Sequence, residues 1–140
     1  MKQIFLVIIF AACFVSESMA KGTEETHIEF STFGPLTVYR QSAQPSHVVL
    51  FVSGDGGWNL GVIEMARELA SLDALVVGVD IVHYLKNLES QSGGCSYPAA
   101  DLEMLSKFVQ KNFDYPRYVN PVLVGYSSGA TLVYAVLAQS

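Results

Sequence analysis

The sequence predicts an α/β fold with a doubly wound, mainly parallel sheet. Three short segments consist almost entirely of aliphatic and aromatic side chains, which is typical of strands covered on both faces: 48–52, 75–77 and 122–124. Segments with helical composition and periodicity lie between and after them, at about 59–72, 98–112 and 130–139. This alternation of strand and helix is the pattern of parallel β-α-β units.

Each predicted helix carries apolar residues that would pack on the sheet. In the segment 59–72 the polar residues recur at intervals of three and four, which leaves these residues to face the sheet: Ile63, Met65, Ala66, Leu69 and Ala70. In the segment 98–112 the expected inward residues are Leu102, Leu105, Phe108 and Val109, with Asp101 on the solvent side. The segment 130–139 is apolar almost throughout and has the composition of a buried helix.

An antiparallel hairpin is expected before the first core strand. Residues 27–30 alternate polar with apolar side chains, a Gly-Pro turn follows, and residues 36–39 suggest a returning strand. Residues 21–26 are polar and are expected to be loose. The one long irregular stretch is expected at 81–97, at the sheet edge where such folds bind ligands. It would form part of a substrate mouth or be a passive surface loop.

Residues 1–20 have the features of a secretory signal peptide. Lys2 supplies a positive start, a short apolar segment follows, and cleavage is expected after Ala20. The apolar segment is shorter than the roughly 20 residues that span a bilayer. A lipoprotein signal, cleaved before and anchored through Cys13, is the competing interpretation. Residues 21–140 would then be a single exported domain, periplasmic or secreted.

Charge and cysteine content exclude some function classes. The formal net charge is −5, and no run of Lys or Arg follows residue 20, which argues against a nucleic-acid-binding face. Cys95 is the only cysteine after residue 20. In an oxidising compartment it should be either buried and inert or paired with a cysteine outside this chain.

The motif expected to carry the chemistry follows the strand 122–124. The sequence G-Y-S-S-G at 125–129 fits G-x-S-x-G and leads into a predicted helix, which is the order of a nucleophile elbow. Gly125 and Gly129 fit this role because the strained turn brings backbone close together. Ser127 is the candidate nucleophile. The motif also occurs by chance, so a glycine-lined turn with a solvent-facing serine is the alternative.

A serine nucleophile needs donors that hold the negative charge developing on the attacked carbonyl oxygen. The glycine-rich stretch 52–58 leaves the first core strand, the position from which α/β-hydrolases supply one such N–H. Asp55 or Gly56 is the expected donor there. The backbone N–H of Ser128, which follows the nucleophile, is the expected second donor.

The base that must take the proton of Ser127 has no clear candidate. In this fold the triad runs Ser, then acid, then His, and no residue after Ser127 is acidic or His. His27 and His47 are most simply interpreted as structural residues without a catalytic role. His83 lies near the carboxyl edge of the sheet and makes a tempting pair with Asp80, but recruiting it would break the chain order of the fold.

A dinucleotide-binding unit is a competing interpretation. Gly54 and Gly56 between strand and helix, with Asp80 at the end of the next strand, imitate that fingerprint. The third glycine position is Asn59, however, and export would place the chain where NAD is absent. No Lys follows the glycines, so a phosphate-binding Walker loop fails as well. We therefore expect neither a cofactor nor a metal.

Four motifs occur together in the segment from about 48 to 135: F-V-S-G-D-G-G-W at 51–58, V-G-V-D at 77–80 with Tyr84 after it, A-A-D-L at 99–102, and V-L-V-G-Y-S-S-G-A at 122–130. With these motifs the chain resembles the bacterial VirJ/AcvB virulence-factor family of exported α/β-hydrolases. The pairing of the first and last motifs is far more specific than either alone.

The resemblance implies a periplasmic serine hydrolase. Members look like hydrolases of aminoacylated phosphatidylglycerol that cleave the ester joining lysine to the lipid head group, and the family is associated with type IV secretion. Ser127 would be the nucleophile, and Ser128 with the loop glycines the oxyanion site. The implied partners are a lipid or small acyl-ester substrate, with peripheral membrane contact, and components of a secretion system.

Several alternatives stay open at the level of the residues. Thioesters and amides are possible substrates of the same acyl-transfer chemistry. A non-catalytic hydrolase-like module that binds exported proteins or secretion components is the competing function, and an inactive fragment is the other alternative. Trp58 and Tyr126 flank the proposed site, where they would either contact a lipid head group or belong to the core.

The strand 122–124 is expected to need a neighbour on its far side. In an α/β-hydrolase sheet the elbow strand is internal, and ending at Ser140 would leave it as an exposed apolar edge with a partly uncovered helix beside it. We therefore expect the chain to be the N-terminal part of a longer protein, or a truncated product: an α/β-hydrolase domain that stops after the nucleophile elbow.

Residues 21–140 produced alone should express poorly or form a molten species, because the apolar edge and helix would face water. Thermal unfolding followed by near-ultraviolet circular dichroism, together with the oligomeric state in solution, checks this expectation. A sharp cooperative melt of a soluble monomer would contradict it.

Overall fold

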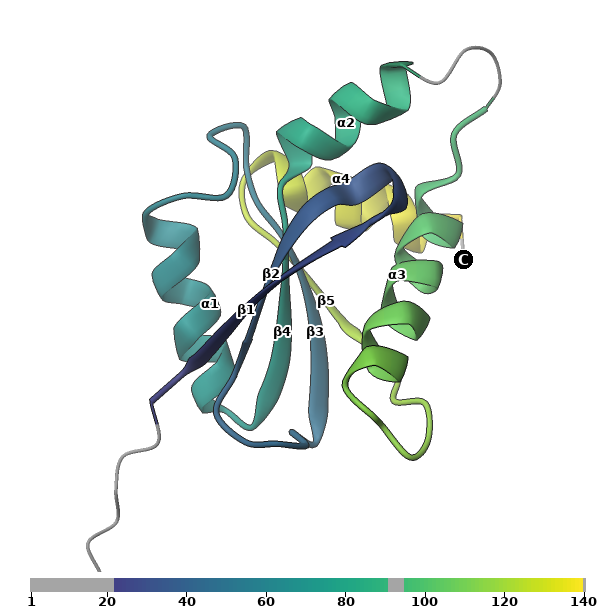
Figure 1. Ribbon diagram of the computed structural model, residues 1–140. Coiled ribbons are helices and arrows are strands. Elements are labelled where there is room, and N and C mark those ends of the chain that lie inside the picture. The colour runs from purple at the N-terminus through teal and green to yellow at the C-terminus, as the bar shows by residue number, and fades with distance from the viewer. Residues whose placement is uncertain (1–21, 91–94, 140) are drawn as a thin grey trace, which may run out of the picture.

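The computed structural model describes residues 22–90 and 95–139, so the expected signal peptide and Cys13 lie outside the described residues. Within these ranges the chain forms one five-stranded sheet with helices on both faces (Figure 1). No helix there is long and apolar enough to cross a membrane. The elements are, in chain order, β1 (Glu24–Phe30), the 3₁₀ turn η1 (Ser31–Phe33), β2 (Gly34–Arg40), β3 (His47–Val52), α1 (Gly61–Ser71), β4 (Ala74–Val79), α2 (Ile81–Ser90), α3 (Pro98–Asn112), β5 (Val122–Gly125) and α4 (Ser128–Leu137).

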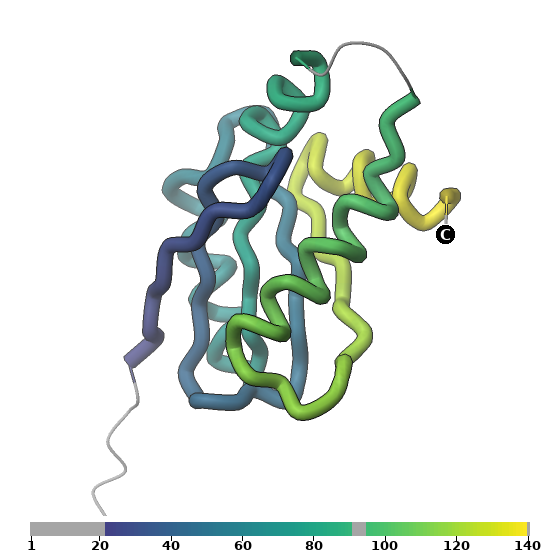
Figure 2. The backbone as a smooth tube through the Cα atoms, turned by 45° about the vertical axis from the view of Figure 1, so that its right-hand side comes forward, coloured from purple at the N-terminus to yellow at the C-terminus, as the bar shows by residue number. Residues whose placement is uncertain are grey.

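The sheet has the strand order β1-β2-β4-β3-β5, and its central part is parallel. β3 pairs in parallel with both β4 and β5, so Val49 lies opposite Val76 on one side and Val122 on the other. β2 pairs antiparallel with β1 and β4. β1 and β5 are the two edges of the described sheet (Figure 2). The predicted α/β class is confirmed, with a mixed sheet.

Helices cover both faces of the sheet, because its core strands are apolar on both sides. α1 lies on one face, where Val62, Ala66 and Ala70 are buried in a core that includes Phe51. α3 and α4 lie on the other face (Figure 1), over a larger core that includes Leu50. Neighbouring residues of β3 thus belong to opposite layers.

Two predicted helices agree closely with the structure. α3 spans the predicted residues 98–112, and its expected stripe packs on the core. α1 begins at Gly61, two residues later than predicted. The prediction that Met65 faces the sheet was wrong: Met65 is exposed and Val62 is buried instead, because the sheet-facing stripe of α1 runs at four-residue spacing through Val62, Ala66 and Ala70.

α4 is less buried than its composition suggested. It begins at Ser128, and only Gly129 and Val136 are buried within it. Tyr134 is 76% and Leu137 56% exposed. The packing of α4 on β5 and β3 therefore covers only one side of an apolar helix.

The antiparallel hairpin is present and begins earlier than predicted. β1 starts at Glu24, so residues 24–26 belong to a strand although their polarity suggested a loose segment. Glu24 lies opposite Arg40 in the strand register. The guanidinium of Arg40 donates to both carboxylate oxygens of Glu24, at 2.9 and 3.1 Å. This bidentate pair holds the polar end of the strand in place.

Residues 81–97, expected to be irregular, contain a ten-residue helix, α2. Asp80 precedes it, and its Oδ1 accepts the backbone N–H groups of Val82 and His83 at 2.9 and 3.2 Å. This is the geometry of a helix N-cap, which satisfies donors that have no partner inside the helix. The prediction was wrong because a short amphipathic helix was taken for a loop.

Tyr84 fixes α2 to the core. Its ring is fully buried and stacks on Phe33 at a centroid distance of 4.5 Å. Its hydroxyl donates to Oδ2 of Asp101 on α3, at 2.8 Å. The prediction that Asp101 faces solvent was therefore wrong: its side chain is partly buried and bonds to Tyr84 of α2. Burial raises the pKa of Tyr84 well above its usual range, and the Asp101 carboxylate raises it further.

The free energy of unfolding should fall as the pH rises above about 10. The pKa of Tyr84 is raised by folding, and burial raises the pKa of Tyr115 to about 12. As the pH rises, the unfolded state therefore loses these protons before the folded state does. The stability that the protonated tyrosines contribute is fully present below their unfolded pKa and is lost as the pH rises through the folded pKa. Each such tyrosine steepens the fall by about 1.4 kcal/mol per pH unit.

Urea unfolding between pH 8 and 12, with the protein encoded by the native reading frame, checks this dependence. Tyr84→Phe should be less stable at neutral pH, because the bond to Asp101 is lost, and should show a shallower alkaline decline. Tyr134→Phe changes an exposed tyrosine and is the matched control. Equal alkaline slopes for the wild type and Tyr84→Phe would contradict the prediction.

Candidate active site

Ser127 lies at a sharp turn between β5 and α4. Its backbone has φ 55° and ψ −122°, a conformation that residues with a side chain rarely adopt and that stores strain. Two backbone hydrogen bonds hold the turn. The N–H of Tyr126 donates to the carbonyl of Val52 at 3.0 Å, and the N–H of Gly129 donates to the carbonyl of Tyr126 at 2.9 Å. The strained serine is therefore fixed against the end of β3.

The two glycines of the motif are required by close backbone contacts. A Cβ at Gly125 would lie 2.5 Å from backbone atoms of Ala130. A Cβ at Gly129 would lie 2.3 Å from the carbonyl oxygen of Ser53 and 2.4 Å from that of Val52. Since side-chain carbons do not approach backbone atoms this closely, the turn can form only with glycine at both positions.

The loop 53–60, between β3 and α1, lies against Ser127. A Cβ at Gly54 would lie 2.9 Å from the Cβ of Ser127, so loop and serine are nearly in contact. The backbone N–H groups of Asp55 and Gly56 have no acceptor within residues 22–90 and 95–139. The loop therefore presents unpaired N–H donors beside Ser127.

Ser128, which follows Ser127, provides a further backbone donor. It is the first residue of α4, and the first N–H groups of a helix have no acceptor inside the helix. The helix dipole adds a partial positive charge at the same end. The hydroxyl Oγ of Ser128 is buried and has no hydrogen-bond partner in the described part of the chain. These donors give the turn the means to stabilise an anion.

Trp58 anchors the loop in the core. Its indole Nε1 donates to the hydroxyl of Tyr39 at 3.2 Å, and its ring meets Phe51 edge to face at a centroid distance of 5.4 Å. The indole also occupies the space beside Gly78, where a Cβ would lie 2.1 Å from it. Of the two aromatics flanking the site, Trp58 thus belongs to the core, whereas Tyr126 is half exposed.

A cavity of about 290 Å³ opens beside Ser127. The residues that line it include the loop glycines, Met65 and Tyr126. Asp55 brings a carboxylate, and no Lys or Arg of the described residues lines the cavity. The site is therefore small, open and negatively charged.

None of the chain's three histidines lines this cavity. His27 is on the edge strand β1, and His47 opens β3 at the opposite end of that strand from the loop. His83 lines a separate cavity of about 220 Å³ together with Asp80 and Trp58. The structure therefore does not bring a histidine to Ser127 within the described residues.

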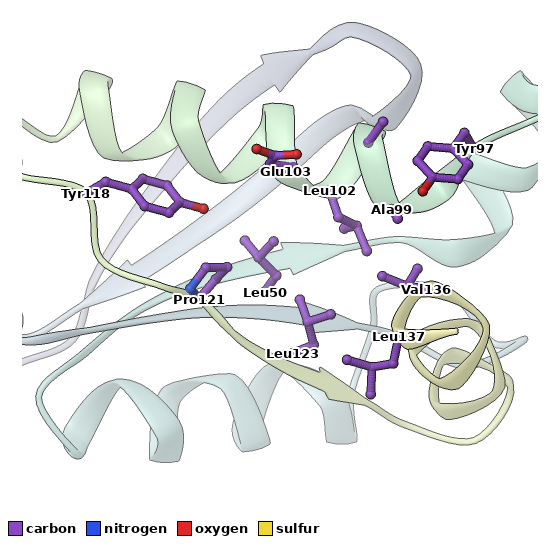
Figure 3. A pocket seen from close by; sticks show the side chains of 11 residues that line it. Leu50, Tyr97, Ala99, Leu102, Glu103, Tyr118, Pro121, Leu123, Val136 and Leu137 are labelled. Atoms are coloured by element: carbon purple, nitrogen blue, oxygen red, sulfur yellow. The ribbon is translucent and has the colours of Figure 1, made fainter. Parts of the chain in front are cut away.

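Another cavity, of about 440 Å³, lies between α3, α4 and β5 (Figure 3). Its walls are mainly apolar, with Leu50, Leu102, Leu123 and Val136 pointing into it (Figure 3). Ser127 and the loop 53–60 are not part of its lining. It is therefore separate from the candidate active site.

Asp80 has a contact that the sequence interpretation missed. Its Oδ2 accepts the backbone N–H of Trp58 at 3.1 Å, while Oδ1 caps α2. The carboxylate thus accepts hydrogen bonds from backbone N–H groups, in place of the dinucleotide or the His83 partner considered from the sequence. An aspartate directly after a strand and before an amphipathic segment was the available signal for the cap.

The other sequence expectations concern metals and Cys95. No group of three or more His, Cys, Asp or Glu within residues 22–90 and 95–139 could hold a metal ion. Cys95 is exposed and has no disulfide partner within the described residues. Of the two alternatives expected from the sequence, the buried, inert thiol is therefore wrong, and pairing with a cysteine outside this chain stays a prediction. Cys95 follows directly on the undescribed residues 91–94 and lies at the beginning of the segment leading to α3.

Comparison with known proteins gives a family match. The family model described as "Bacterial virulence protein (VirJ)" matches residues 46–139. The match begins just before β3 and includes the loop 53–60, Asp80 and the Ser127 turn. The searches of curated proteins and of solved structures returned no match.

Gly129→Ala should destabilise the protein by about 3 kcal/mol or more, because the added carbon would overlap with two carbonyl oxygens of the β3 end. Gly61→Ala is the matched control, since nothing lies within 4 Å of a Cβ there and the position is in a helix. That change should be neutral or stabilising. Urea unfolding measures both, and equal effects of the two substitutions would contradict the close contact.

Proposed function

The chain belongs to the VirJ family of bacterial virulence proteins, and on this premise we propose that it is an exported serine hydrolase that cleaves carboxylic esters through an acyl-Ser127 intermediate. The observation that carries the proposal is the strained backbone of Ser127 between a strand and a helix N-terminus. Strained backbone costs folding energy and persists only where the surrounding structure holds it in place. Such residues cluster at functional sites.

The reaction would proceed by acyl transfer. The Oγ of Ser127 attacks the ester carbonyl carbon, and its proton passes through a general base to the departing alcohol. Water then hydrolyses the acyl-serine and releases the carboxylic acid. The N–H groups of Ser128 and of Asp55 or Gly56 would hold the oxyanion that forms in both steps. The mechanism needs a base that none of the three histidines supplies in the described structure.

Two features support an α/β-hydrolase fold for this domain. The serine turn follows β5, a strand that pairs in parallel with β3, and opens a helix, as the nucleophile elbow of that fold does. The loop between β3 and α1 lies against the serine, and α/β-hydrolases take their second oxyanion donor from the corresponding loop.

The substrate we propose is an aminoacylated phosphatidylglycerol, the substrate class implied by the family resemblance. A lysyl ester carries ammonium groups beside the scissile bond, and the carboxylate of Asp55 at the cavity would attract them. The absence of Lys and Arg from the described lining removes a source of repulsion. Action on such a lipid implies a periplasmic location and peripheral contact with the membrane.

A binding role is the second candidate, favoured by the absence of a histidine near Ser127 among the described residues. In that case the cavity would hold an exported protein segment or a secretion component without cleaving it. The two roles differ in their need for the serine hydroxyl, which only the hydrolase uses chemically.

Ser127→Ala should lower ester hydrolysis by more than about a thousandfold, because the nucleophile is lost. The protein encoded by the native reading frame is assayed with p-nitrophenyl acetate and with vesicles containing lysyl-phosphatidylglycerol. Ser71→Ala, an exposed serine at the end of α1, is the matched control. Unchanged hydrolysis by Ser127→Ala would overturn the assignment of the nucleophile. Absence of hydrolysis with retained virulence function in both variants would favour the binding role.

A further inference from the structure

We infer that Asp80 is the positioning residue of the oxyanion site: its carboxylate holds the loop 53–60 in the conformation that presents the Asp55 and Gly56 N–H groups to Ser127. This inference rests on the proposed hydrolase function and adds to it a residue outside the Ser127 cavity. Asp80 lies just beyond the end of β4, at the carboxyl edge of the sheet. Asp80 is not among the residues that line the cavity beside Ser127.

One carboxylate oxygen of Asp80 is committed to the loop. Oδ2 accepts the backbone N–H of Trp58 at 3.1 Å. At Gly57, which has φ 75°, a Cβ would lie 2.9 Å from the same oxygen, so the loop backbone passes directly over the carboxylate. The N–H of Gly57 in turn donates to the carbonyl of Gly54 at 2.9 Å. These contacts fix the chain on both sides of Asp55 and Gly56.

The other oxygen holds α2. Oδ1 accepts the first free N–H groups of that helix, from Val82 and His83. Three donors therefore share two oxygens, and each oxygen has a separate task. A hydrogen bond from a backbone N–H to a carboxylate is shorter and stronger than one to a neutral acceptor. The negative charge also suits the N-terminus of α2.

The division of tasks makes Asp80→Asn a selective probe. Asparagine caps helices as well as aspartate does, so its single oxygen can keep the bonds to α2. Its amide NH₂ would then face the N–H of Trp58, and two donors would repel each other. The loop should lose its anchor while α2 and the fold remain. The side chain of Trp58 still ties the loop to Tyr39, which should limit the movement.

Asp73→Asn provides the matched control. Asp73 precedes β4 as Asp80 follows it, and its Oδ2 accepts the backbone N–H of Ser46 at 3.1 Å. The chemical change is the same, at the opposite end of the same strand. Asparagine also tolerates the positive φ of 58° at this position. Asp73→Asn should leave kcat unchanged.

Two measurements test the inference on the protein encoded by the native reading frame. Kinetics with p-nitrophenyl acetate should show kcat of Asp80→Asn lowered by about ten- to a hundredfold with KM nearly unchanged, because oxyanion donors act mainly in the transition state. Hydrogen–deuterium exchange should show faster exchange in peptides covering 53–60, with α2 unchanged. A loop that exchanges at the wild-type rate, or an equal loss of kcat in Asp73→Asn, would overturn the inference.

The exchange measurement separates this inference from the proposed function. If Ser127→Ala retained full activity, the hydrolase proposal would fall, whereas faster exchange of the loop in Asp80→Asn would still establish the anchor. If exchange changed but kcat did not, Asp80 would be an ordinary structural anchor, and its role at the oxyanion site would be refuted.

Discussion

The close packing of the Ser127 turn against the end of β3 is the constraint on which the rest of the site depends. Gly129 lies so near the carbonyls of Val52 and Ser53 that no side chain fits, and the N–H of Tyr126 bonds to the carbonyl of Val52. β3 therefore both pairs with two parallel neighbours, β4 and β5, and supports the strained serine. The loop that leaves β3 is brought to Ser127 by the same contact.

Much of the fold could be predicted because the relevant signals are local. The core strands are continuous apolar runs, and the α3 stripe through Leu102, Leu105 and Val109 repeats at helical spacing. The glycines at 125 and 129 were also predictable, because a strained strand-to-helix turn leaves no room for side chains at its flanks. Ser127, Ser128, Asp55 and Gly56 were likewise placed beside one another by motif and chain order. Their chemical roles remain predictions.

Prediction from the sequence failed where contacts between distant parts of the chain determine the local structure. α2 was taken for a loop because its helix is short, and its stability comes from the burial of Tyr84 against Phe33 and from the Asp80 cap. β1 begins among polar residues because the carboxylate of Glu24 pairs with the guanidinium of Arg40 across the hairpin. Met65 and the exposed side of α4 show the same limit, since composition alone does not tell which apolar residues meet a partner.

The placement of Trp58 has a consequence for spectroscopy. It is the only tryptophan of the chain, and it is wedged between Phe51, Tyr39 and the backbone of Gly78 at the base of the loop. Its indole emission therefore originates from a single position next to the site. Changes in wavelength or quenching of that emission would report on the loop itself, without a label and without a substrate.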